Sequence, residues 1–178
     1  MIIDADPHWF VLRVTYSRSL KVQKILEDKG IRTFIPMRSV RVEKDGKTLR
    51  KTVPAVGNLL FARSVQQTLY EHIKSEGEAP ITRFLWDRNT GRPLVVPDKQ
   101  MDDFIRVCQA SGDDALFLTR PDAKLTEGAR IRVVSGPLAG VEGRVVRIRK
   151  SRRVLVDLPG LLSVASTYIP LDLLEVLP

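Results

Sequence analysis

The first part of the chain alternates apolar runs with segments in which apolar residues recur at helical spacing. The run at residues 9–15 predicts a buried strand. After it, Val22 and Leu26 recur at helical spacing, Ser17 stands where it can cap a helix, and Gly30 can supply a left-handed C-terminal stop. The pattern therefore predicts a strand followed by an amphipathic helix.

A second strand at residues 31–36 is followed by a segment, residues 38–51, that predicts a two-stranded ribbon. Asp45 and Gly46 form a pair that tolerates the positive φ angles of a tight hairpin turn. The cations of this ribbon are Arg38, Arg41, Lys44, Lys47, Arg50 and Lys51. The ribbon is therefore expected to be strongly basic.

Two further strand and helix pairs follow the ribbon. Residues 59–62 predict a strand, and Ser64 has capping-box spacing to Gln67 ahead of a second helix. A short strand at residues 94–96 precedes a third helix, which Asp98 can cap. These elements complete an α+β domain in which an antiparallel sheet is flanked by helices.

After residue 110 the pattern of apolar, Gly and Pro residues changes. We assign the α+β domain to residues 1–110 and interpret residues 111–126, which lack sustained periodicity, as a linker. Residues 127–178 hold short runs of Val, Ile and Leu between Gly and Pro turns, a pattern typical of a small all-β barrel. Two domains are therefore expected.

Composition and charge narrow the class of protein. The chain has 178 residues, of which 43% are hydrophobic and 28% charged, as in a soluble globular protein. Its net charge of +8 favours a polyanion or an acidic protein surface as partner. Cys108 is the one cysteine, and residues 1–7 lack the features of a targeting segment. We therefore expect a cytoplasmic monomer that does not bind membranes.

Candidate chemistry is sparse. His8, His72 and Cys108 cannot form a standard metal site by themselves, and the glycines lack the Gly-Lys-Ser/Thr ending of a phosphate-binding loop. The adjacent acids at residues 102–103 lie in a predicted helix, where neighbouring side chains diverge and do not form an acid–base pair. Those at residues 113–114 are better explained as solvated side chains, and Cys108 as a small core residue. The sequence therefore predicts no enzyme, no metal and no cofactor.

The strongest local motif lies at residues 127–145, where a strand runs into a Gly-Pro turn and glycines allow a compact reversal into the next strand. This segment resembles the KOW motif, which implies an SH3-like barrel. Its motif residues are Gly128, Gly136, Pro137, Gly140 and Gly143. Because KOW modules also occur in ribosomal proteins, a KOW-type ribosome-associated or RNA-binding protein stays an alternative.

Motifs in the N-terminal half distinguish a ribosomal or RNA-binding KOW protein from other proteins that contain a KOW module. Residues 9–12, Lys21, residues 54–61 and residues 92–99 occur in the order seen in the NusG N-terminal domain. With the KOW motif, they make the chain resemble a NusG-family transcription elongation factor. Residues 56–59 are Val-Gly-Asn-Leu, where the family usually has a Phe-Pro-Gly-Tyr-like turn. This departure suggests a specialised paralogue that antiterminates surface-polysaccharide operons.

The resemblance implies a non-enzymatic regulator that binds the clamp region of RNA polymerase through its N-terminal domain and promotes processive transcription. By motif position, the clamp contact includes Arg13, Leu59 and Phe61 with Lys21 beside them. A second contact, to the polymerase lobe, falls at residues 70–72, which are Tyr70, Glu71 and His72. For Leu59 and Phe61, ordinary core packing is an equal alternative.

Two basic clusters remain to be assigned. The ribbon cations can contact DNA or nascent RNA, with a solvated hairpin as the alternative. The second cluster consists of Arg144, Arg147, Arg149, Lys150, Arg152 and Arg153. The resemblance implies that the barrel recruits the NusE ribosomal protein or Rho, so this cluster can serve protein binding instead. Because the segment is rich in β-branched residues, Gly and Pro, we expect a barrel and not a helical hairpin.

Overall fold

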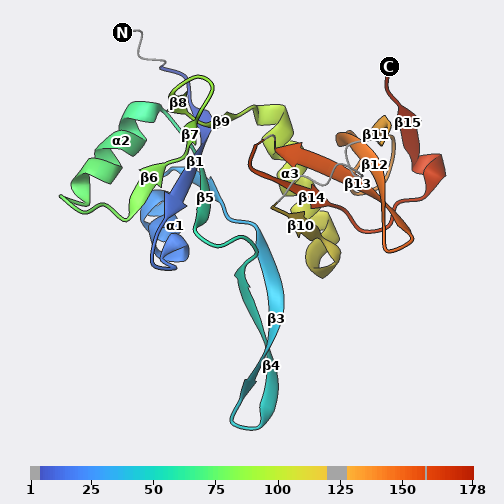
Figure 1. Cartoon of the computed structure of the whole chain (residues 1–178), viewed down its shortest axis with the longest axis horizontal. Coiled ribbons are helices and arrows are strands. Elements are labelled where there is room, and N and C mark those ends of the chain that lie inside the picture. Colours follow the sequence, from blue (N-terminus) through green and yellow to red (C-terminus); the bar gives the residue numbers. More distant parts are fainter. Residues whose placement is uncertain (1–4, 120–127, 159) are drawn as a thin grey trace. The chain divides into compact units, whose positions relative to one another are not determined.

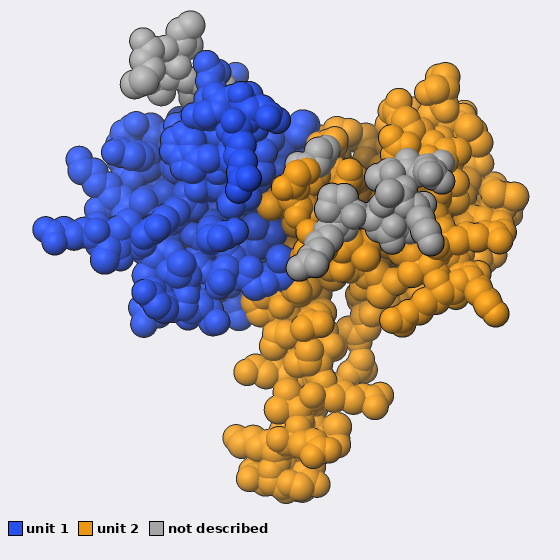
Figure 2. Space-filling view, in the orientation of Figure 1, with its two compact units in different colours: residues 1–35, 56–98 blue, residues 36–55, 99–178 orange. Residues whose placement is uncertain are grey.

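The computed structural model describes residues 5–119, 128–158 and 160–178. It divides into two compact units, residues 1–35 with 56–98, and residues 36–55 with 99–178 (Figure 2). The ribbon and most of the third helix therefore belong to the second unit. The domain boundaries at residues 110 and 126 stay a prediction.

The first unit is built on an antiparallel sheet of five strands in the order β2-β5-β1-β6, with β9 also paired to β1 (Figure 1). Its strands are β1 (His8–Val14), β2 (Arg32–Phe34), β5 (Leu59–Ser64), β6 (Thr82–Phe84) and β9 (Val95–Val96). A two-stranded ribbon of β7 (Trp86–Asp87) and β8 (Arg92–Pro93) follows β6. Trp9, Val11, Leu12, Leu60 and Phe61 are almost completely buried and form much of the core.

Helices α1 (Ser19–Asp28) and α2 (Gln66–Ser75) complete the first unit. Helix α1 ends at Asp28, and Gly30, two residues further on, supplies the predicted left-handed stop with a φ of 77°. There the Gly30 N–H donates to the Glu27 carbonyl at 2.8 Å, and the Ile31 N–H donates to the Leu26 carbonyl at 3.0 Å. This pair of bonds satisfies carbonyls that a helix end leaves open.

Two of the three predicted helix caps, at Ser17 and Ser64, are wrong. In the described residues, neither α1 nor α2 receives a side-chain hydrogen bond at its N-cap position. Ser17 has a φ of 55°, so the backbone there is not in the extended conformation that an N-cap residue usually adopts. Ser64 ends β5 instead, and Val65 occupies the N-cap position of α2.

The second unit contains a six-stranded antiparallel sheet in the order β10-β14-β13-β12-β11-β15. Its strands are β10 (Leu116–Leu118), β11 (Arg130–Val133), β12 (Glu142–Ile148), β13 (Ser151–Leu158), β14 (Leu162–Ala165) and β15 (Leu174–Val176). The 3₁₀ segment η3 (Leu171–Leu173) precedes β15. The predicted fold class, an α+β part followed by a small all-β part, is confirmed, and the C-terminal segment is β and not helical.

The segment interpreted as a linker is partly ordered. The 3₁₀ turn η1 (Gly112–Asp114) follows helix α3 (Asp98–Ser111), and β10 then pairs with β14 in the barrel sheet. The pattern of apolar residues did not reveal β10, because three residues are too few to show an alternation. The prediction for residues 120–126 lies outside the described residues.

The glycines of the KOW-like motif serve two structural purposes. Gly136 and Gly140 have φ angles of 84° and 86°, a conformation that L side chains rarely adopt. At Gly143, an added Cβ would lie 2.3 Å from the Leu155 carbonyl oxygen on β13. The motif therefore specifies a turn and a close approach of two strands.

The predicted ribbon consists of β3 (Met37–Lys44) and β4 (Lys47–Pro54) (Figure 1). Asp45 and Gly46 form its turn with φ angles of 53° and 71°, as expected for the Asp-Gly pair. Residues 41–52 are all exposed. Arg50 forms an ion pair with Asp113 of η1, which ties the ribbon to the second unit.

Candidate functional site

The sheet of the first unit presents two arginines side by side. Arg13 on β1 lies directly opposite Arg83 on β6, and both side chains are exposed. Directly opposed residues of an antiparallel pair share a face, and like charges there destabilise the sheet. Lys21 on α1 is also exposed. These cations are therefore accessible to an anionic or acidic partner.

Leu59 and Phe61, the other residues of the expected clamp contact, are buried, with 6% and 0% of their surface exposed. Their strand, β5, is internal to the sheet, between β2 and β1. Of the two alternatives that the sequence left open, the structure therefore shows core packing. Neither side chain is accessible to a partner in this conformation.

Exposed apolar side chains of the first unit lie elsewhere. Tyr70 on α2, Trp86 on β7 and Tyr16 in the β1–α1 loop are all more than half exposed. Tyr70 was one of the predicted contact residues, whereas Tyr16 and Trp86 were not predicted from the sequence. Tyr16 has a φ of 58°, which is unusual for a bulky residue. Tyr16 lies between two hydroxyl residues, Thr15 and Ser17, and outside every predicted helix or strand. This position indicates a loop, and from it the exposure of the Tyr16 side chain could have been predicted.

Of the three residues in the expected lobe contact, Tyr70 and Glu71 are exposed, whereas His72 is buried. The placement of His72 at a surface contact is therefore wrong. It lies inward from α2, where Lys29 donates to its Nδ1 atom at 3.4 Å and Glu76 Oε1 is 3.4 Å from Nε2. Burial lowers the pKa of His72, and the Lys29 ammonium lowers it further, so the ring is neutral at neutral pH.

Glu76 fixes the start of β6 as well. Its two carboxylate oxygens accept hydrogen bonds from the Thr82 backbone N–H at 2.8 Å and the Thr82 hydroxyl at 2.6 Å. His72, Lys29 and Glu76 therefore connect α1, α2 and β6 within the first unit.

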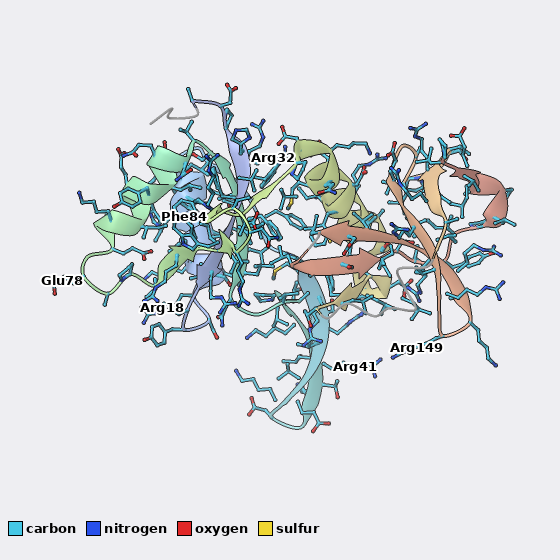
Figure 3. All side chains as sticks on the ribbon, turned by 45° about the horizontal axis from the view of Figure 1, so that its top comes forward. Arg18, Arg32, Arg41, Glu78, Phe84 and Arg149 are labelled. Carbon is cyan, nitrogen blue, oxygen red and sulfur yellow. The ribbon has the colours of Figure 1, made fainter. Side chains whose placement is uncertain are left out.

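The ribbon cations are also arranged in opposed pairs. Arg41 lies opposite Arg50, and Lys44 lies opposite Lys47 at the turn. Arg38 and Lys51 are exposed as well, and Figure 3 shows Arg41 on the ribbon. Because Arg50 is paired with Asp113, its charge is partly neutralised within the protein. The remaining cations of the ribbon surround an exposed apolar pair, Val42 opposite Leu49.

The structure separates the six barrel cations into two groups. Arg144 donates to the Gly128 carbonyl at 3.2 Å, and Arg153 donates to the carbonyls of Asp114 and Ser166 at 2.9 and 2.7 Å. These two arginines hold backbone segments together. The other four, Arg147, Arg149, Lys150 and Arg152, lie at the end of the β12–β13 hairpin.

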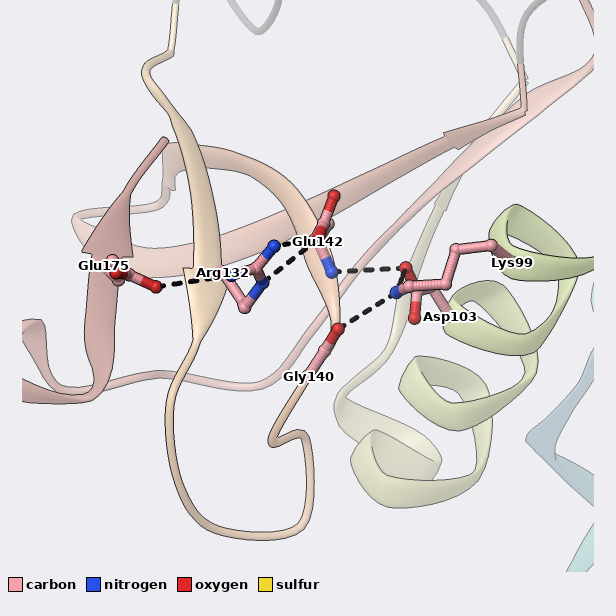
Figure 4. A network of polar contacts seen from close by, with 6 residues as sticks. All are labelled: Lys99, Asp103, Arg132, Gly140, Glu142 and Glu175. Carbon is pink, nitrogen blue, oxygen red and sulfur yellow. Dashed lines mark hydrogen bonds and ion pairs between the residues drawn. The ribbon is translucent and has the colours of Figure 1, made fainter. Parts of the chain in front are cut away.

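A polar network joins α3 to the barrel within the second unit (Figure 4). Lys99 donates to the Gly140 carbonyl at 3.0 Å and forms an ion pair with Asp103. Glu142 accepts two hydrogen bonds from Arg132, at 3.1 and 2.8 Å. This hydrogen bonding by Arg132 is the main reason that the pKa of Glu142 is lowered. The Asp103 side chain is buried, so its carboxylate lies inside this network.

The surroundings of Cys108 disfavour the thiolate form. Burial raises the pKa of the Cys108 thiol to about 12. Within the described ranges, no group of three His, Cys, Asp or Glu residues is placed to hold a metal ion. Among the helices that the structure describes, none is both long and apolar enough to span a membrane.

The first unit thus presents exposed cations, among them Arg13 and Arg83, and exposed aromatic rings. The comparison with protein families matches residues 7–105 to the family described as "Transcription termination factor nusG". This match spans more than half of the chain, so the chain belongs to the NusG family. Members of this family are non-enzymatic transcription elongation or termination factors that generally interact with RNA polymerase.

Among solved structures, the chain is similar to NusG from Thermotoga maritima, in the structure titled "Domain interaction in Thermotoga maritima NusG". The identity is 15%, the TM-score is 0.49, and the match covers 97% of this chain and 98% of that chain. The comparison with curated proteins found no match.

Proposed function

We propose that this chain binds the clamp region of RNA polymerase and promotes processive transcription, as an antiterminator of the specialised NusG type. The observation that carries the proposal is the exposed pair Arg13 and Arg83, with exposed Lys21 and Tyr70 in the same unit. Arg and Tyr are enriched among residues that dominate protein interfaces. The family match at residues 7–105 includes all four.

The first test is capture of core RNA polymerase by the full-length protein. Arg13→Glu combined with Lys21→Glu reverses two exposed charges and is expected to weaken capture at least about tenfold. The control is Lys74→Glu combined with Arg88→Glu, which reverses two exposed charges elsewhere in the same unit. Equal capture of RNA polymerase by both variants would show that Arg13 and Lys21 do not lie in the interface.

The second test distinguishes antitermination from termination. We expect the protein to raise the fraction of transcripts that pass a pause or a Rho-dependent terminator in a purified transcription reaction. A lower fraction would instead indicate a termination factor. RNA binding without polymerase binding would favour the ribosome-associated alternative.

The ribbon is proposed to add nucleic-acid affinity to this activity. Its support is the opposed pair Lys44 and Lys47, because directly opposed like charges destabilise a strand pair and a bound phosphate would offset their repulsion. Arg50 is excluded from the test because of its Asp113 partner. Changing Arg41, Lys44, Lys47 and Lys51 to Ser is expected to lower the salt dependence of DNA or RNA binding in a filter assay. An unchanged salt slope would leave the ribbon a solvated surface.

A further inference from the structure

Four cations lie together at the end of the β12–β13 hairpin. Arg147 and Arg152 are directly opposite each other on the two strands, and Arg149 and Lys150 form the two-residue turn between Ile148 and Ser151. Figure 3 shows Arg149 at the end of this hairpin. The sequence between Glu142 and Asp157 contains no acidic residue that could neutralise the cluster.

Local structure disfavours these residues at these positions. Arg149 and Lys150 have φ angles of 49° and 66°, in the left-handed region that costs energy for residues with a Cβ. Two-residue turns of this kind strongly prefer Asn-Gly or Gly-Gly. The like charges of Arg147 and Arg152 destabilise the strand pairing as well. Two independent costs therefore fall on one small cationic surface.

An exposed aromatic ring lies on the segment beside this hairpin. The Ile169 N–H donates to the Arg152 carbonyl at 3.1 Å, and Arg153 donates to the Ser166 carbonyl at 2.7 Å. These bonds hold residues 166–169 alongside the start of β13. Ser166 and Ile169 are buried, whereas Tyr168 is 55% exposed. The segment is thus fixed by its neighbours while the tyrosine ring stays accessible.

We propose that the hairpin end and Tyr168 form a binding surface for single-stranded nucleic acid, separate from the polymerase contact and from the ribbon. The four cations contact phosphates, and Tyr168 stacks on an unpaired base. Cationic surfaces with an adjacent aromatic platform bind single strands in this way. Stacking requires a base that is free of its duplex partner, which favours a single strand over a duplex.

An acidic protein is the less favoured partner. Protein interfaces have a desolvated core around their anchor residues. At the hairpin end, however, Ile148 is half-buried and the tip residues are both charged and exposed. Val134, Leu171 and Val176, the other exposed large apolar residues of the barrel, lie outside the β12–β13 hairpin. Phosphate contacts need no such core.

The test uses full-length protein and a fluorescein-labelled 12-nucleotide oligouridine, with binding followed by anisotropy at several salt concentrations. The variant is Arg149→Asn with Lys150→Gly, which supplies the residues that this turn prefers. We expect a higher melting temperature together with weaker binding and a salt slope smaller by about 1.4, from two lost phosphate contacts. The control is Arg88→Ser with Arg92→Ser, which removes two exposed charges in the first unit.

Tyr168 is tested separately. Tyr168→Ala is expected to weaken binding about 5- to 150-fold, whereas Tyr168→Phe keeps the ring and most of the affinity. The same assay with a single-stranded DNA of equal length shows whether the surface prefers RNA or DNA. A preference for either one supports the proposed surface. The proposal is overturned if the turn variant binds with unchanged affinity and salt slope, if it is less stable than the wild type, or if a duplex of equal length binds as tightly as the single strand.

Discussion

The buried carboxylate of Asp103 on α3 accepts a hydrogen bond from the backbone N–H of Glu142 on β12, with Oδ2 and N 3.2 Å apart (Figure 4). Lys99 pairs with the same carboxylate and also donates to the Gly140 carbonyl. Two backbone groups of the motif turn are thus held by side chains one helical turn apart on α3. The helix therefore stabilises a distant turn: Asp103 and Glu142 are 39 positions apart in the sequence, and Lys99 and Gly140 are 41 apart.

Asp103→Ala is expected to lower the free energy of unfolding by about 1–3 kcal/mol, because it leaves the Glu142 N–H without its acceptor. Urea unfolding measures the effect. The control is Gln109→Ala, which changes an exposed residue of the same helix and should have an effect within about 0.5 kcal/mol. Equal losses in both variants would show that the Asp103 contact does not stabilise the fold.

Gly143→Ala is expected to disrupt the barrel, because its Cβ would lie 2.3 Å from the Leu155 carbonyl oxygen and backbone must move. A loss of about 3 kcal/mol or more is anticipated, at the high end for single substitutions. At Gly57, an added Cβ would meet open space in the described part of the structure, so Gly57→Ala is the matched control. Near-UV circular dichroism and thermal unfolding compare the two. A native-like Gly143→Ala protein would contradict the close approach of β12 and β13.

His72 is expected to make stability depend on pH. Because its folded pKa lies below the unfolded value of about 6.5, the unfolded chain binds the proton first as the pH falls. This contribution to stability is complete above about pH 7 and is lost as the pH falls through about 6.5. The melting temperature of the wild type should therefore fall more than that of His72→Gln between pH 7.5 and 5.5. Parallel pH profiles would assign the dependence to other groups.

Cys108 is expected to resist thiol reagents in the folded protein. Burial raises its thiol pKa to about 12, so very little of the reactive thiolate exists at pH 8. Reaction with Ellman's reagent should be slow in buffer and fast in denaturant. Rapid reaction of the native protein would mean that the α3 face opens readily, and a Cys108→Ala variant supplies the background rate.

The family followed from a resemblance to known motifs, whereas the residue pattern by itself determined the order of most elements and the β character of the C-terminal segment. These properties follow from short-range signals: apolar periodicity, the Asp45-Gly46 pair, and the Gly-Pro punctuation around Gly136. The predicted caps at Ser17 and Ser64 were wrong because local signals do not fix the first residue of a helix. Capping depends on where a helix begins, and sequence patterns place helix boundaries only to within a few residues.

Only the tertiary structure decided which candidate residues are accessible. Phe61 and His72 are buried by residues distant in the sequence, as the pairing of Phe61 with both Val11 and Phe34 illustrates. The six barrel cations look equivalent along the chain. They differ because Arg153 reaches the carbonyls of Asp114 and Ser166, whereas Arg149 occupies the hairpin turn. Burial and hydrogen-bond partners depend on which strands lie side by side, and β1, β2 and β5 are paired although they are far apart in the sequence.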